Sequence, residues 1–127
     1  MIHKINLEHI LFLDIETAPQ KVDFSELSQA EQELWAEKTK YKRNENEKPS
    51  NFYKNAGIWA EFGQILCISV GFFTFSGQKR KFRITSFSGN ELDLLQHFND
   101  LLNKHFNKRY HRLCAHNGKE FDFPFLA

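Results

Sequence analysis

The stretch LFLDIETAP, residues 11–19, runs from an apolar segment directly into two carboxylates, Asp14 and Glu16. The apolar run at residues 10–13 predicts a central β-strand that is covered on both faces. Side chains two positions apart on a strand point to the same face, so Asp14 and Glu16 are expected to project together. Two neighbouring carboxylates repel each other, and a divalent cation relieves that repulsion. The stretch therefore predicts an Mg²⁺ or Mn²⁺ site at the carboxyl end of a strand.

A simpler interpretation of this pair stays open. Asp-x-Glu arises by chance in many chains of this length, and most such pairs are solvated. The position of Asp14 and Glu16 favours a functional role, because active sites of open α/β sheets gather at the carboxyl ends of strands.

The composition bounds the class of protein. The chain has 127 residues, a net charge of +1 and 14 phenylalanines, which predicts one domain with a packed core. This charge neither requires nor excludes nucleic acid, so any binding surface has to be local.

The two cysteines, Cys67 and Cys114, each lie in an apolar run. Without Cys-x-x-Cys spacing they are expected to be buried free thiols in a reducing compartment. The opening residues MIHKINLEH lack the apolar segment of a signal peptide, and no apolar stretch is long enough to span a bilayer. The sequence therefore predicts a cytoplasmic protein with no membrane partner.

Residues 20–60 are polar and predict a helical insertion beside the first strand. Ser28 and Glu31 have the spacing of a capping box at a helix start. Aromatic residues of this region could stack on the bases of a single strand, with a packing role as the alternative: Tyr41, Phe52, Tyr53 and Trp59.

The second half predicts a hairpin, a helix and a short strand. Residues 62–75 and 80–87 read as the two arms of the hairpin, with Phe82 and Ile84 on one face. Asn90 is a helix cap, and the helix has an apolar stripe of Leu94, Leu95, Phe98, Leu101 and Leu102. With the short strand at residues 112–116, the elements predict an α/β class with a mixed sheet and flanking helices.

A third carboxylate follows the last predicted strand. Asp122 lies after the Asn117-Gly118 turn, at the start of a predicted helix. That helix is expected to direct Phe121, Phe125 and Leu126 to the core and to leave Asp122 facing the strand ends.

Together, FLDIET and HNGKEFDFPFL resemble the first and second motifs of the DEDD family of 3′–5′ exonucleases. The segment FGQILCISVGF is similar to one branch, the predicted exonucleases related to the proofreading domain of B-family DNA polymerases. The resemblance spans essentially the whole chain, closely at its two ends and loosely between them.

The resemblance implies a ribonuclease H-like fold and a two-metal hydrolysis of DNA from single-stranded 3′ ends. It implies that Asp14 bridges two Mg²⁺ or Mn²⁺ ions and that Glu16 holds the ion that activates water. Asp122 would hold the ion near the leaving group. Thr17, Asn117 and Phe121 are the corresponding candidates for substrate binding. Thr17 and Asn117 have turn formation as their alternative role.

The sequence departs from the family at its third motif, because no Tyr or His followed four positions later by Asp comes after Asp122. We therefore expect residues 1–127 to be the N-terminal portion of a single exonuclease domain, truncated at the C-terminus and weakly active or inactive. Phe121, Phe123, Phe125 and Leu126 would then favour self-association. The alternatives are a non-catalytic nucleic-acid-binding or interaction module of the same fold, and a related nuclease acting on RNA.

Overall fold

The structure, a computed structural model, describes residues 4–127. It divides into two compact units, which are described separately below. The first combines the residues up to Glu16 with Ile65–Ala127, and the second is Thr17–Gln64. Within the described range, no helix combines the length and the apolar character needed to cross a membrane.

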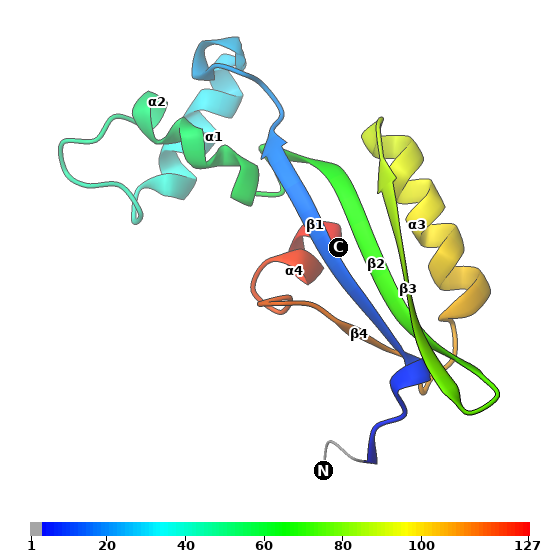
Figure 1. Cartoon of the computed structure of the whole chain (residues 1–127). Coiled ribbons are helices and arrows are strands. Elements are labelled where there is room, and N and C mark those ends of the chain that lie inside the picture. Colours follow the sequence, from blue (N-terminus) through cyan, green and yellow to red (C-terminus); the bar gives the residue numbers. More distant parts are fainter. Residues whose placement is uncertain (1–3) are drawn as a thin grey trace. The chain divides into compact units, whose positions relative to one another are not determined.

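Four strands form one mixed sheet, as the sequence predicted (Figure 1). They are β1 (Ile10–Pro19), β2 (Gly63–Ser76), β3 (Lys79–Ser88) and β4 (Arg112–Cys114), and they lie in the order β3-β2-β1-β4. β3 pairs antiparallel with β2, and β4 pairs parallel with β1. Gly77 has a φ of 65° in the hairpin turn, a conformation that glycine adopts without a steric penalty.

The prediction that the apolar run at residues 10–13 is covered on both faces holds for one face only, because Ile10 and Phe12 on the other face are half-buried. Leu11, Leu13 and Ile15 are buried, whereas Asp14 and Glu16 between and after them are exposed. This alternation is typical of a strand with one face on the core and one face open. The apolar run could not reveal it, because burial of the second face depends on what packs there.

Helix α3 (Glu91–His105) covers the buried face of the sheet. Asn90 caps it, as predicted, by accepting hydrogen bonds from the backbone N–H groups of Leu92 and Asp93. Leu94 and Phe98 are fully part of the core, and the rest of the predicted stripe packs against them. Figure 1 shows α3 lying along the hairpin of β2 and β3.

Cys114 is exposed and Cys67 is half-buried, so the prediction of two buried thiols is wrong for Cys114. β4 is an edge strand of three residues whose side chains are all exposed. An apolar run does not show whether its strand lies at the centre or the edge of a sheet.

The second unit is helical. It contains η3 (Phe24–Glu26), α1 (Gln29–Thr39), α2 (Pro49–Phe52) and η4 (Tyr53–Ile58). The capping box is confirmed: Glu31 N–H donates to the Ser28 hydroxyl at 3.2 Å, and Ser28 N–H donates to the Glu31 carboxylate at 2.7 Å. Beyond the C-terminus of α1, the Arg43 guanidinium donates to the Ala36 carbonyl at 2.9 Å, which satisfies one of the free carbonyls of the helix end.

Aromatic side chains build the core of this unit, whereas Tyr41 is 83% exposed and its stacking on bases stays a prediction. Trp35 has no exposed surface, and its indole N–H donates to the Pro49 carbonyl at 2.9 Å. Tyr53 is 3% exposed, and its hydroxyl donates to the Lys21 carbonyl at 3.0 Å. Because the Tyr53 ring is buried, the prediction that it stacks on bases is wrong. Trp59 is half-buried against Trp35, with ring centroids 6.0 Å apart.

Candidate functional site

Asp14 and Glu16 lie side by side on the open face of β1. The sequence Leu-Asp-Ile-Glu produces this arrangement, because Leu13 and Ile15 anchor the opposite face in the core. Both carboxylates are exposed. They are therefore accessible to a cation or a ligand from solvent.

The turn at Asn117 and Gly118 begins the segment that carries the third carboxylate. Asn117 has a φ of 54°, a left-handed conformation that asparagine tolerates better than most residues. Its carbonyl accepts backbone hydrogen bonds from Glu120 and Phe121, both at 3.1 Å. The predicted turn role of Asn117 is confirmed, and a contact of its side chain with substrate stays a prediction.

Gly118 is buried where the turn meets the next helix. A Cβ atom built there would lie 2.7 Å from the Ala115 Cβ and 2.9 Å from the Phe123 ring. The Gly118 carbonyl accepts a hydrogen bond from the Phe123 N–H at 2.8 Å. A side chain at position 118 would therefore separate the turn from the start of the helix.

Asp122 begins the short helix α4 (Asp122–Leu126) and points to β1. It is 2% exposed, and its Oδ1 accepts a hydrogen bond from the Ile15 backbone N–H at 3.2 Å. Phe121 and Phe125 are half-buried against the core, with ring centroids 5.7 Å apart. The predicted orientation of this segment is confirmed. Phe121 has a packing role, and its contact with substrate stays a prediction.

The three carboxylates differ in environment. Asp14 and Glu16 are exposed, whereas Asp122 is buried and bonded to backbone. Their oxygen donors have the chemistry that Mg²⁺ or Mn²⁺ requires. However, within residues 4–127 no three His, Cys, Asp or Glu side chains form a group arranged to hold a metal ion.

A shallow hollow of about 190 Å³ adjoins Asp14 on the open face of the sheet. Phe12, Phe82 and Ile84 line it, together with Gly71 of β2. The alternation along the hairpin predicted that Phe82 and Ile84 share one face, but it gave no connection with Asp14. The register of the hairpin does not predict this contact, because it depends on β1 lying beside β2, and that arrangement forms between segments far apart in the sequence.

Thr17, the predicted nucleotide contact, belongs to the second unit. Its hydroxyl donates to the Gly57 carbonyl at 2.6 Å. Gly57 is buried, and a Cβ atom there would lie 3.2 Å from the Ala18 Cα. The side chain of Thr17 thus holds the backbone of its own unit, and its role toward substrate stays a prediction.

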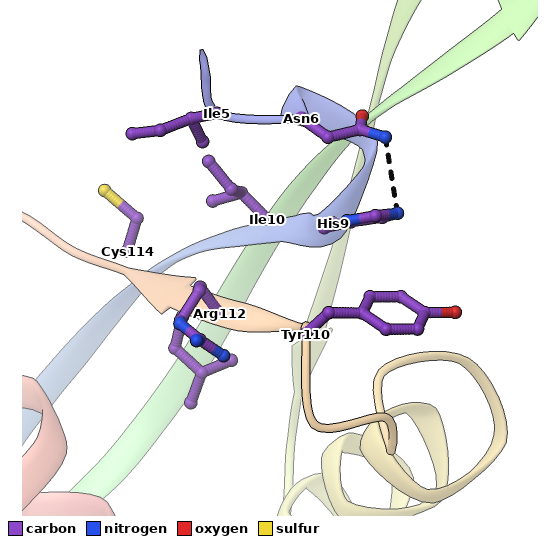
Figure 2. A pocket seen from close by; sticks show the side chains of 8 residues that line it. Ile5, Asn6, His9, Ile10, Tyr110, Arg112 and Cys114 are labelled. Atoms are coloured by element: carbon purple, nitrogen blue, oxygen red, sulfur yellow. Dashed lines mark hydrogen bonds between the residues drawn. The ribbon is translucent and has the colours of Figure 1, made fainter. Parts of the chain in front are cut away.

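Two further hollows in the first unit lack paired acids. One of about 400 Å³ lies at the amino end of β1, next to η2 (Leu7–His9) (Figure 2). Its lining residues are Ile5, Asn6, His9, Ile10, Tyr110, Arg112, Leu113 and Cys114. The other, of about 650 Å³, lies beside α3 and includes Glu8, Arg83 and His105. The first hollow is lined by no Asp or Glu and the second by Glu8 alone. The open face of β1 carries both Asp14 and Glu16 and is therefore the stronger candidate site.

Comparison with protein-family models, with curated proteins and with solved structures finds no match for this chain.

Proposed function

We propose that this chain carries a metal-dependent 3′–5′ exonuclease site of ribonuclease H-like fold, acting on DNA with single-stranded 3′ ends. The observation that carries the proposal is the hydrogen bond between Ile15 N–H and Asp122 Oδ1. It joins the two segments whose sequences resemble the first and second motifs of the DEDD exonucleases. Ile15 lies between Asp14 and Glu16, so the bond brings the third carboxylate to the strand that carries the other two.

The open face of β1 supports the same proposal. Asp14 and Glu16 are exposed, and a strand needs no adjacent pair of exposed acids for its own packing, since like charges destabilise it. Asp14, Glu16 and Asp122 would hold Mg²⁺ or Mn²⁺. When bound, such ions supply an activated water and stabilise the charge of the transition state. β1 holds Asp14 and Glu16 accessible from solvent, and the buried Asp122 lies against the same strand through its hydrogen bond with the Ile15 N–H.

A second candidate is a non-catalytic nucleic-acid-binding or interaction module of the same fold. The observation that favours it is the separation of the carboxylates in the described residues, where no group of three is arranged around one point. Hydrolysis of RNA rather than DNA is a variant of the first proposal, because no residue singled out in the site reads a 2′-hydroxyl.

Calorimetric titration with Mn²⁺ tests the proposal. We expect Asp14→Ala and Glu16→Ala to lose most of the binding heat of the unmodified chain. The matched control is Asp100→Ala, which removes an exposed carboxylate from α3. Equal heats from the unmodified chain and Asp14→Ala would overturn the metal site. Binding of Mn²⁺ with no release of mononucleotides from single-stranded DNA would favour the second candidate.

A further inference from the structure

The face of the sheet that carries Asp14 continues into a row of aromatic side chains. Phe12 precedes Asp14 by two positions and therefore lies on the same face of β1. Its ring centroid is 6.0 Å from both the Phe73 ring and the Phe82 ring. Phe73 and Phe82 are paired across the hairpin, with their centroids 4.8 Å apart.

The row ends in a cation near the tip of the hairpin. Phe75 and Arg80 are the next pair on the same face. The Arg80 guanidinium carbon lies 5.3 Å from the centroid of the Phe75 ring and 5.7 Å from that of Phe73, within the range of cation–π attraction. We call Phe12, Phe73, Phe75, Arg80 and Phe82 the aromatic strip. Phe75 and Phe82 are each 46% exposed, so their rings are available to a ligand.

The hairpin has a local excess of positive charge. Residues 62–90 contain no Asp or Glu and four cationic residues, Lys79, Arg80, Lys81 and Arg83. The net charge of the whole chain is only +1, so this excess is a property of the hairpin. Side chains alternate along β3, so Arg80 shares the face of the strip and the other three cations lie on the opposite face. A cation beside exposed aromatic rings can bind single-stranded nucleic acid through a phosphate contact and base stacking.

We infer that the aromatic strip binds single-stranded nucleic acid, with bases stacked on Phe75 and Phe82 and a phosphate held by Arg80. The hollow between Phe12, Phe82 and Ile84 then receives the 3′-terminal nucleotide beside Asp14. The placement of the 3′ end rests on the proposed exonuclease function, whereas the stacking surface does not. A second copy of this chain is a poorer occupant, because two hairpins meeting face to face would bring their cations together.

Fluorescence anisotropy in EDTA tests the strip without any contribution from metal-bound carboxylates. The probe is a labelled oligothymidylate of roughly ten nucleotides, within the site sizes typical of such surfaces. We expect Phe75→Ala to weaken binding roughly tenfold, as one stacked base is lost. The matched control is Tyr110→Ala, which removes another exposed aromatic ring from the same unit.

The salt dependence isolates the phosphate contact. We expect Arg80→Ala to reduce the slope of log affinity against log salt by roughly 0.7, the value for one phosphate on a single strand. Lys104→Ala removes the same charge from α3 and should leave the slope unchanged. The inference would be overturned if Phe75→Ala and Arg80→Ala both bound the oligonucleotide with the affinity and the salt slope of the unmodified chain. Self-association that depends on Phe75 would do the same.

Two results separate this inference from the proposed function. A flat Mn²⁺ titration together with Phe75-dependent binding would overturn the metal site and leave the strip standing. Photo-crosslinking of oligonucleotides that carry 5-iododeoxyuridine at one position locates the 3′ end. We expect a label at the 3′-terminal base to crosslink to the peptide that contains Phe82, and a label at an upstream base to crosslink to the peptide that contains Phe75. Crosslinks in the reverse order would overturn the proposed direction of the nucleic-acid strand on the aromatic strip.

Discussion

The Asp122 carboxylate accepts a hydrogen bond from the Ile15 backbone N–H at 3.2 Å, although the two residues are 107 positions apart in the sequence. β4 pairs with β1 only as far as Phe12, so Asp122 satisfies a donor of β1 beyond the end of the ladder. Buried backbone donors are almost always paired. Asp122 therefore has a structural role that is independent of any metal.

Removal of this acceptor should destabilise the chain. We expect Asp122→Ala to lower the free energy of unfolding by about 1–3 kcal/mol, the cost of leaving a buried donor unpaired. Asp122→Asn keeps a carbonyl oxygen at the same position, so its loss should be smaller. Urea unfolding of both variants measures the difference.

Asp100→Ala is the control for that series, since Asp100 is exposed on α3. If Asp122→Ala were as stable as Asp100→Ala, the bond to Ile15 would contribute nothing measurable. A metal-binding defect in Asp122→Asn with near-normal stability would separate a ligand role of Asp122 from its structural one.

Asn117 allows a test of turn formation against substrate contact. Its φ of 54° costs an ordinary side chain about 1–2 kcal/mol and glycine nothing. We therefore expect Asn117→Ala to be less stable than the unmodified chain by about 1 kcal/mol and Asn117→Gly to be nearly unchanged. Thermal unfolding measures both. Oligonucleotide binding by Asn117→Gly then decides the second role, because only a direct contact of the side chain would weaken it.

Local signals in the sequence predicted local structure well. The Asn90 cap and the leucine stripe after it depend on spacing within one helix, and so does the pair of Ser28 and Glu31. The alternation at Asp14 and Glu16 likewise follows from the geometry of one strand. These features require no knowledge of what packs against the element.

Features that depend on distant packing could not be predicted in the same way. The exposure of Cys114 follows from the position of β4 at the sheet edge. The burial of Tyr53 follows from packing around Trp35. The spacing before Asp122 indicated that it faces the strand ends, but its bond to Ile15 arises only when α4 lies against β1.

The capping box of α1 should make the second unit sensitive to acid. Hydrogen bonds from the Ser28 backbone N–H and hydroxyl lower the pKa of Glu31 below its ordinary value of 4.5. A carboxyl whose pKa is lower in the folded state stabilises that state above its ordinary pKa. This stabilisation is lost as the pH falls below 4.5 and through the lowered value. Helix content by circular dichroism should therefore fall in this acid range.

Glu31→Gln should remove that part of the acid sensitivity, because the amide does not titrate yet still accepts a hydrogen bond. Glu45→Gln, at an exposed turn position, is the control for the loss of one carboxylate. An acid transition of the same midpoint and size in Glu31→Gln and the unmodified chain would show that the box does not respond to pH.

The two closely packed glycines of the first unit should differ in their tolerance of a methyl group. A Cβ atom at Gly118 would meet Ala115 and Phe123 inside the turn, whereas one at Gly71 would meet the end of the Phe82 ring at 2.3 Å. Phe82 is 46% exposed, so its ring can rotate away. We expect Gly118→Ala to lose about 1–3 kcal/mol of unfolding free energy, as overpacked sites do.

Gly71→Ala should lose less stability and instead weaken oligonucleotide binding, because it displaces the Phe82 ring from the aromatic strip. Denaturant unfolding and anisotropy on the same two variants give the comparison. Hydrogen exchange at Ile15 adds a local measurement, since Gly118→Ala should loosen the turn that holds Asp122 and speed exchange there. The reverse ranking, with Gly71→Ala the less stable variant, would mean that Phe82 is fixed in place and cannot yield to a ligand.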